Sequence, residues 1–453
     1  MSRTLNILLL VHDSSRHIGT VDDHIAALEN NSGHYVTVFD CFAAGRLDLD
    51  LSYFDIVVLH YSLVISMTAY VSPNLAVKLI AFKGLKVLFI QDEYRWINRT
   101  AEAIRQLEID VIFTVLNSDV IHRVYYHHWF NRIRIEQTLT GFVPEHLRTI
   151  ETPPYTERLI DVGYRARKLS AWFGSFGREK WLIGERFSKA APGYGLRCDI
   201  SSEEADRLYG QDWIRFLSNC KAVLGTESGT SFCDFDGSIQ SNVESYEALH
   251  PEVRFEEVRD LFLGDKDGDI VIHVISPRCF EAASLRTLMI MYPGEYSGIF
   301  QPWRHYVPLQ RDHSNMDEVV AVLRDPARAG KIIDNAYREI ACSDRWTLNS
   351  FVAHFDRVMN EEIDAATARR QAYIQVRPAQ IAAHIETKQR QAQWYRYQQE
   401  MIRAMNQIAV RVMGSLLMFS QRLPSPFARL AYRLIRWFFY RIKNIAKRIL
   451  GRA

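Results

Sequence analysis

The chain has 453 residues, of which 48% are hydrophobic and 24% are charged, an ordinary composition for a globular protein of two or three domains at about 100–200 residues each. Six cysteines without a Cys-x-x-Cys pair argue against a zinc site or a disulfide framework and suit a reducing compartment. The formal net charge is +2, but Glu400 is the last acidic residue and eleven basic residues follow it, so the chain ends in a basic tail.

The first apolar run, residues 5–11, predicts a β-strand. It lacks a cleavage-like end and Asp13 follows at once, so we expect a strand there and not a signal peptide. No uncharged run reaches the ~18–20 residues needed to cross a bilayer. We therefore expect a cytoplasmic protein.

Apolar runs and amphipathic stretches alternate through the first 150 residues. This alternation predicts βαβ units and a parallel sheet, so the region is expected to be Rossmann-like. It has no G-x-G-x-x-G after the first strand, which argues against an NAD enzyme. The expected strands are residues 5–11, 35–39, 56–59, 86–90 and 111–114, and the expected helices are residues 19–28, 75–81, 101–107 and 120–126.

Polar side chains follow several of these strands. His12 and Asp13 come after the first strand, His60 after the third, and Asp92 and Glu93 after the fourth. Because the carboxyl ends of parallel strands meet at one sheet edge, they are candidates for a common site. The alternative is that they are helix caps and ordinary loop residues.

A second set of strand and helix patterns starts after the proline-containing segment 141–154, which we interpret as a crossover between domains. Strands are expected at 159–164 and 222–225, and helices at 172–189 and 213–219. The domains are thus predicted as 1–150 and 151–362, followed by a helical extension, 363–453. Residues 230–269 read as a loop-rich insertion, either an active-site flap or, as we favour, solvated decoration.

The stretch 269–298 carries the densest pattern. Residues 270–275 predict a strand buried on both faces of a parallel sheet, the turn Ser276-Pro277-Arg278 follows, and a helix at 280–286 and a strand at 287–292 come next. Ser276, Arg278 and Glu281 are therefore expected where a strand meets a helix amino end, a place that favours anions.

The segment FEAASLRTLMI, residues 280–290, resembles the donor-site segment of group 1 GT-B glycosyltransferases, and the chain looks closest to their CgeB-like branch. The resemblance implies that Glu281 binds ribose or sugar hydroxyls of a nucleotide-sugar. Family members often carry another Glu eight residues earlier, where this chain has His273. The stretch DVGYRARK, residues 161–168, resembles the first strand of the family's donor domain, which implies Arg165 and Lys180 as diphosphate ligands, with Arg167 as a near alternative.

The chemistry of such a donor supports cationic ligands independently, since a leaving diphosphate gains negative charge that fixed cations stabilise. The alternative is a basic surface cluster. Glu227, in the turn after the expected strand 222–225, is a further candidate for a hydroxyl or base edge, or for a capping turn.

The last part of the chain is expected to be helical at 316–340 and 348–362, and GT-B folds typically return to the first domain with such helices. Within residues 427–450 apolar side chains recur at steps of three and four, with basic residues off that face. This pattern favours a helix on an anionic membrane surface. The alternatives are docking on the protein's own core, an oligomer contact or RNA binding.

Taken together, the predicted fold is α/β of the GT-B type, with two Rossmann-like domains facing a cleft. The expected function is metal-independent glycosyl transfer from a nucleotide-sugar to a glycan or lipid-linked acceptor in cell-surface polysaccharide assembly. The nucleotide-sugar is a co-substrate, and no other cofactor is expected. The reaction is expected at the inner membrane face. No nucleic-acid partner is expected. The acceptor's base is expected from the first domain, with Asp13, His12 and Glu93 as candidates. The alternatives are a non-catalytic sugar-binding or scaffold protein and a GT-B-like epimerase.

Overall fold

The computed structural model describes residues 4–44 and 49–368, together with 383, 386–388, 390–391 and 397. The chain forms two compact units, one of residues 1–45 and 50–374 and the other of residues 46–49 and 375–453. The first unit contains both sheets described below. The expected membrane helix, 427–450, lies outside the described residues.

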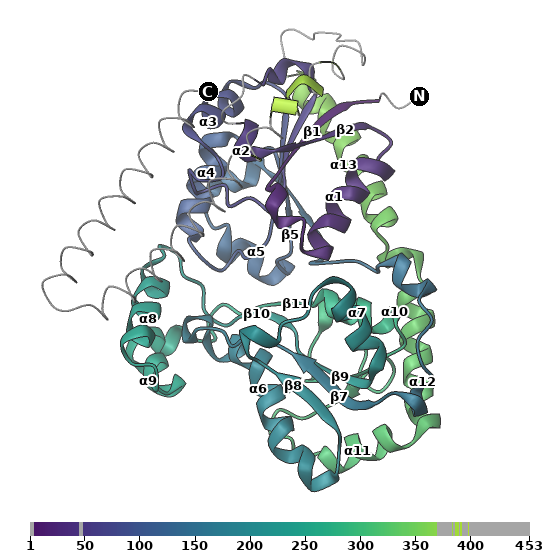
Figure 1. Ribbon diagram of the computed structural model, residues 1–453. Helices are drawn as coiled ribbons and strands as arrows, with labels where there is room; N and C mark the ends of the chain where they lie inside the picture. Colours follow the sequence, from purple (N-terminus) through teal and green to yellow (C-terminus); the bar gives the residue numbers. More distant parts are fainter. Residues whose placement is uncertain are drawn as a thin grey trace, which may run out of the picture. The chain divides into compact units, whose positions relative to one another are not determined.

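The first half of this unit is built on a six-stranded sheet in the order β2-β1-β3-β4-β5-β6, in which every neighbouring pair is parallel (Figure 1). All five strands predicted for this region are present, and β6 is an additional edge strand. The strands are β1 (Asn6–Val11), β2 (Tyr35–Asp40), β3 (Ile56–Leu59), β4 (Leu85–Ile90), β5 (Val111–Thr114) and β6 (Arg134–Gln137), and the main helices are α1 (Gly19–Asn31), α3 (Pro73–Ala81), α4 (Ile97–Leu107) and α5 (Ser118–Val124).

The second half repeats the design with a five-stranded parallel sheet in the order β13-β12-β9-β7-β8. The predicted α/β class with two Rossmann-like sheets is thus confirmed. The strands are β7 (Ile160–Arg165), β8 (Cys198–Ser201), β9 (Cys220–Gly225), β12 (Leu288–Met291) and β13 (Val307–Pro308), and the helices are α6 (Gly174–Ala190), α7 (Gly210–Asn219), α10 (Pro277–Ser284), α11 (Met316–Arg324) and α12 (Pro326–Ala336).

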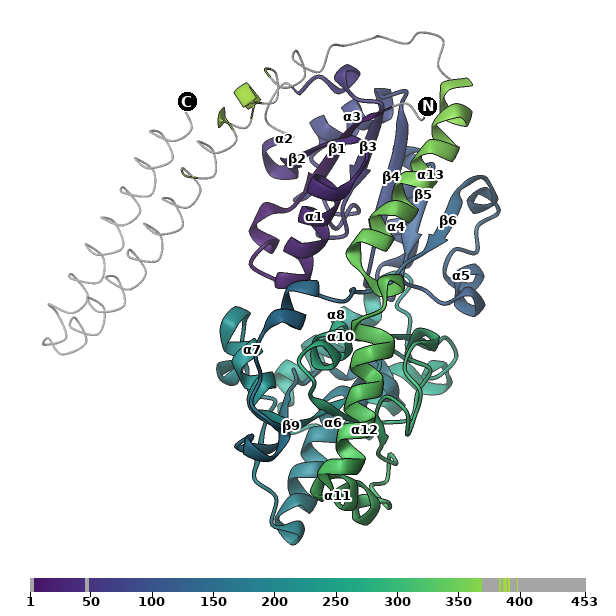
Figure 2. The ribbon, with the colours of Figure 1, turned by 90° about the vertical axis from the view of Figure 1, so that its right-hand side faces the viewer.

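The last helix of the unit, α13 (Leu348–Ala368), returns to the first half and packs beside α1 (Figure 2). Its buried side chains, among them Phe351 and Phe355, belong to the core formed by the first sheet. The ring centroid of Phe355 lies 5.8 Å from that of Phe89 on β4. Two parallel sheets with a final helix that crosses back to the first make up the predicted GT-B architecture.

The expectation for residues 270–275 is wrong in one respect. They form β11 (Ile272–Val274), which pairs antiparallel with β10 (Ser228–Thr230) in a separate two-stranded sheet and does not join the parallel sheet. The two strands come so close that a Cβ on Gly229, whose φ is +143°, would lie 1.8 Å from the carbonyl oxygen of Ile272. A short apolar run has the same composition in either arrangement, so the pattern did not distinguish them.

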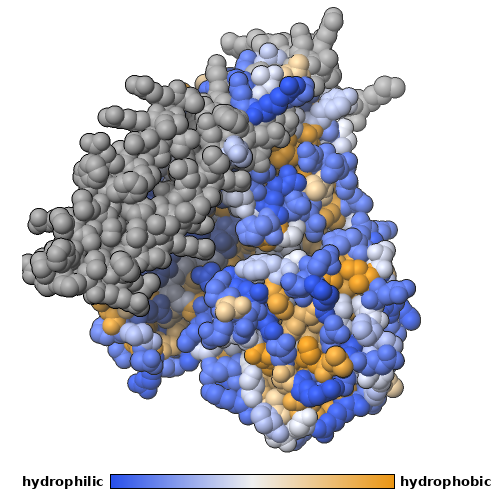
Figure 3. All heavy atoms as spheres, in the orientation of Figure 1, coloured by the Kyte–Doolittle hydropathy of each residue, from blue (hydrophilic) through white to orange (hydrophobic). Residues whose placement is uncertain are grey.

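The insertion 230–269 is helical and packed, which corrects the favoured interpretation of solvated decoration. It contains α8 (Ser238–Leu249) and α9 (Phe255–Val258), whose buried Val243 and Val258 form a small core with Trp172 and with Tyr94 of the first half. The coloured part of the face seen in Figure 3 is mainly hydrophilic, with smaller hydrophobic areas over both halves.

The domain limits remain predictions. The first sheet ends at Gln137 and the second begins at Ile160, on either side of the proposed limit at 150, while α13 runs without a break through the proposed limit at 362. Among the described residues, no helix is long and apolar enough to cross a membrane.

The return of α13 gives a stability prediction. Phe355→Ala should lower the free energy of unfolding by about 3–5 kcal/mol, because it leaves a cavity in the core of the first sheet. Arg357→Ala, an exposed site on the same helix, should change it by no more than about 0.5 kcal/mol. Guanidinium unfolding of the full chain measures both, and equal effects of the two substitutions would contradict the packing of α13.

Candidate functional site

The order of the second sheet marks a crevice. The connections from β7 and β9 leave in opposite directions along the sheet, to β8 and to β12, and ligands of open α/β sheets bind at the carboxyl ends of strands at such a point. A cavity of about 30 Å³ lies there. The polar and aromatic residues lining it include Tyr164, Lys180, Trp213, Thr226, Ser228, Ser276 and Arg278.

Lys180, on α6, supplies a half-buried ammonium to this cavity. Within the described residues its ammonium has no hydrogen bond or salt bridge. The pKa of Lys180 is lowered to about 8, chiefly by burial and in smaller part by the charges of Arg278, Arg167 and Arg207, while Asp92 of the first half opposes the shift. The cavity therefore holds a partly dehydrated cation in a field dominated by other cations, which favours an anionic ligand.

Arg278 and Ser276 stand at the amino end of α10. Ser276 is the residue before the helix, and its side chain makes no capping hydrogen bond. The guanidinium of Arg278 lies over the indole of Trp213, 4.8 Å from the ring centroid, and donates to the carbonyl oxygen of Arg165. Since the amino end of a helix carries partial positive charge, α10 and Arg278 add to the anion preference of the cavity.

Arg165 lies outside the lining of this cavity. Its guanidinium forms a salt bridge of 2.7 Å with Asp199 and donates to the carbonyl oxygens of Asp199 and Asp206 at 2.9 and 3.0 Å. These contacts hold the guanidinium of Arg165 against β8. Its role as a phosphate ligand therefore remains a prediction, and Lys180 and Arg278, which line the cavity, are better placed for that role. Arg167 is exposed.

Glu227 is buried after β9 and holds the loop that follows β12. Its carboxylate accepts the backbone N–H of Tyr296 at 2.7 Å and lies 3.3 Å from Nδ1 of His273, whose pKa is raised by this hydrogen bond. Asn117 of the first half donates to the carbonyl oxygen of His273 at 3.0 Å. In the structure, Glu227 thus connects three segments, and its role in ligand binding stays a prediction.

Glu281 faces the junction of the two halves. It accepts the indole N–H of Trp213 at 2.8 Å, and burial raises its pKa. It lines a second cavity of about 30 Å³ together with Asp23, His24 and Tyr61 of the first half. Glu281 therefore lies near the Lys180 cavity through Trp213 but does not line it, and the ribose-binding role also stays a prediction.

His12 and Asp13 follow β1, as expected, at the point where the first sheet reverses its order between β1 and β3. The imidazole of His12 is hydrogen-bonded to Ser15 at 2.9 Å and to Ser14 at 2.7 Å, so both ring nitrogens are engaged within its own loop. Asp13 begins the short 3-10 turn beside it.

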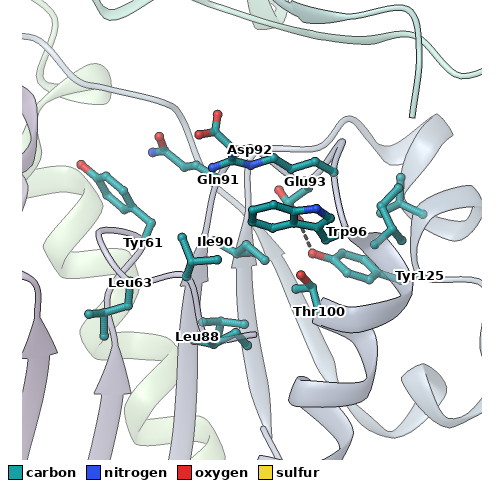
Figure 4. A pocket seen from close by; sticks show the side chains of 15 residues that line it. Tyr61, Leu63, Leu88, Ile90, Gln91, Asp92, Glu93, Trp96, Thr100 and Tyr125 are labelled. Atoms are coloured by element: carbon teal, nitrogen blue, oxygen red, sulfur yellow. Dashed lines mark hydrogen bonds between the residues drawn. The ribbon is translucent and has the colours of Figure 1, made fainter. Parts of the chain in front are cut away.

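Glu93 is buried and lines a different cavity, in the first half (Figure 4). It accepts the hydroxyl of Thr114 at 2.7 Å and that of Tyr125. Burial raises the pKa of Glu93 to about 7, although both hydrogen bonds oppose the rise. The carboxyl of Glu93 thus has a pKa near neutral pH, but its oxygens already accept hydrogen bonds from Thr114 and Tyr125.

The structure brings three of the predicted residues together, Lys180, Ser276 and Arg278. Sequence reasoning missed Trp213 and Tyr164, since single aromatic residues within a helix and a strand carry no signal of a ligand. In the described part of the chain, no group of three or more His, Cys, Asp or Glu side chains is placed to hold a metal ion.

No family model matches the chain, and no curated protein matches it, so the CgeB-like resemblance remains a prediction. Solved structures with a similar arrangement include glycosyltransferases of low sequence identity. An α-glucosyltransferase in complex with UDP is 10% identical, with a TM-score of 0.48, over 80% of this chain and 100% of that one. HepE of Anabaena, with UDP and glucose, is 9% identical, with a TM-score of 0.46, over 79% and 100%. The T4 phage β-glucosyltransferase BGT, with UDP-glucose, is 14% identical, with a TM-score of 0.42, over 80% and 99%.

The raised pKa of Glu93 predicts a pH effect on stability. Below about pH 4.5 the carboxyl is protonated in both the folded and the unfolded chain, so its contribution is fully present, and it is lost as the pH rises to about 7 because the unfolded chain ionises first. In the wild type this group should lower the free energy of unfolding by about 3 kcal/mol between these pH values, and Glu93→Gln should abolish this decrease. Denaturant unfolding at several pH values measures it, and parallel pH profiles of the two proteins would contradict the burial of an ionisable group here.

Proposed function

We propose that the chain is a glycosyltransferase that takes a sugar from a nucleoside-diphosphate sugar, with the diphosphate bound in the cavity at Lys180 and Arg278. The observation that carries the proposal is the ammonium of Lys180, which lies half-buried at the amino end of α10 with no anionic hydrogen-bond partner among the described residues. The resemblance of residues 280–290 to the donor segment of GT-B enzymes supports the same site.

The cations would act on the leaving group. As the bond between the anomeric carbon and the diphosphate oxygen breaks, negative charge grows on that oxygen. An ammonium and a guanidinium fixed in a partly dehydrated cavity stabilise such charge more than they would in water. The dipole of α10 adds to this effect, so these groups would take the place of a metal ion.

The remaining roles follow the resemblance. Glu281 would hold ribose or sugar hydroxyls. It lies at the junction of the two halves, hydrogen-bonded to Trp213 and lining a cavity together with Tyr61. Arg165, Ser276 and Glu227 would support the diphosphate and sugar, Arg165 and Glu227 chiefly by positioning. The acceptor, a glycan or a lipid-linked glycan of a cell-surface polysaccharide, would approach from the first half.

A non-catalytic sugar-binding or scaffold protein is the second candidate. It is favoured by His273, which stands where related donor sites often have a Glu and is engaged here by Glu227 and Asn117. Turnover of a nucleotide-sugar separates the two functions, because a scaffold releases no nucleoside diphosphate.

Binding of nucleotides tests the donor site directly. We expect a thermal shift of the full chain with one of UDP, GDP, ADP, CMP and TDP, and an affinity for that nucleotide about 10- to 150-fold weaker in Lys180→Met, since a charge-assisted contact contributes about 1.5–3 kcal/mol. Lys189→Met, on the same helix but exposed and paired with Glu185, should bind as the wild type does. Unchanged binding in Lys180→Met would remove the diphosphate from this cavity.

The basic tail suggests where the enzyme acts. We expect residues 427–450 to hold the protein on the inner face of an anionic membrane, because their basic residues have no acidic counterpart in the tail. A chain ending at Pro424 should lose most of the binding that the full chain shows to vesicles containing anionic phospholipid. Equal binding by both, or equal binding to neutral vesicles, would contradict this role.

A further inference from the structure

The loop after β4, residues 91–96, carries Asp92, whose charge acts on Lys180 in the cationic cavity of the second half. Asp92 and Trp96 have left-handed backbone conformations, with φ of 58° and 51°. Such conformations cost energy in residues other than glycine and persist only where surrounding contacts impose them. The loop is therefore held in a shape that it would not adopt alone.

The contacts that impose this shape come from the insertion. Asp234 donates its backbone N–H to the carbonyl oxygen of Tyr94 at 2.7 Å. Gly237 lies so close to Trp96 that a Cβ there would be 2.2 Å from the indole Cδ1. Asp234 is itself buried, and its carboxylate accepts the backbone N–H groups of Gly237 and Gln240. The insertion thus fixes the indole of Trp96 over the cavity of the first half.

This cavity, of about 70 Å³, combines an apolar lining with a few polar groups (Figure 4). Leu63, Leu88 and Ile90 form part of its wall, Trp96 lies across it, and Gln91 and Asp92 stand at its rim. A saccharide ring fits such a lining, because its C–H face packs on an indole while its hydroxyls bond to an amide and a carboxylate. A lipid chain would leave the rim groups without partners.

Asp92 and Glu93 are neighbours with opposite environments. Glu93 points down to Tyr125, whereas Asp92 points away from the sheet and is exposed (Figure 4). Among the described residues, the one hydrogen bond that the carboxylate of Asp92 accepts is from the hydroxyl of Tyr94, at 2.8 Å. Its charge also acts on Lys180, the cation that we assign to the donor diphosphate. Asp92 is therefore accessible, and its charge acts on the cation of the donor site.

We propose that this cavity binds a saccharide unit of the acceptor against Trp96 and that Asp92 is the catalytic base. The inference rests on the proposed function. In the step, the acceptor hydroxyl oxygen forms a bond to the anomeric carbon and its proton passes to the Asp92 carboxylate. The bond from the anomeric carbon to the diphosphate oxygen breaks, and its electron pair leaves with the nucleoside diphosphate. Direct attack of this kind inverts the anomeric configuration.

Asp92→Asn is the sharpest variant, since asparagine tolerates the left-handed conformation and its amide oxygen still accepts from Tyr94. With a panel of nitrophenyl glycosides as acceptors and the nucleotide-sugar whose nucleotide binds, we expect kcat for transfer to fall by about 10²- to 10⁴-fold. The dissociation constant for the nucleotide should not change. Trp96→Phe should raise the acceptor KM with little effect on kcat. Asp260→Asn, an exposed carboxylate of the insertion paired with Arg259, should transfer as the wild type does.

Three results would overturn the inference while leaving the donor site intact: transfer by Asp92→Asn at the wild-type rate, retention of the donor's anomeric configuration in the product by NMR, or an unchanged acceptor KM in Trp96→Phe. A wild-type chain that binds none of the nucleotides would instead overturn the proposed function on which it rests. Loss of transfer with unchanged nucleotide binding and an inverted product supports both the base and its site.

Discussion

The candidate site depends on one constraint, which is that the ammonium of Lys180 is partly removed from water and, among the described residues, forms no hydrogen bond or salt bridge with an anion. Lys180 keeps its ammonium in a cavity where Arg278 is near and where its carboxylate neighbour, Asp92, belongs to the other half of the unit. Burial of this kind costs free energy, which the binding of a diphosphate would offset. The parallel sheet explains the location, because the carboxyl ends of β7 and β9 and the amino end of α10 all open on the same crevice.

The two halves are joined at this crevice by polar contacts and not only by the return of α13. Asn117 reaches His273, and Asp234 fixes the loop that carries Asp92 and Trp96. The insertion therefore determines the shape of the first half's cavity from the second half. A donor bound at Lys180 and an acceptor bound at Trp96 would each contact groups whose positions depend on both halves, which couples the two sites through ordinary packing.

Most of the fold followed from sequence because strands such as Ile56–Leu59 and Val111–Thr114 are apolar runs that alternate with amphipathic helices, a pattern that indicates βαβ units. Edge strands such as β6 and β8 were missed because partly exposed strands lack that apolar signal. At the site, Ser276, Lys180 and Arg278 were predicted and converge. Other features of the site depend on contacts between segments that are distant in the sequence, which composition and spacing do not encode. They are the salt bridge of Arg165 with Asp199, the hydrogen bonds of Glu93 with Thr114 and Tyr125, and the exposure of Asp92.

The most direct test of the central claim is release of nucleoside diphosphate from UDP-, GDP-, ADP- and TDP-glucose by the full chain, measured for the wild type and for Lys180→Met. We expect release from one class of donor, even as slow hydrolysis without an acceptor, and a rate at least ~10²-fold lower in the variant because the leaving group loses its stabilising cation. Absence of release from every donor, or equal rates in the two proteins, would contradict the assignment of Lys180 to a leaving diphosphate.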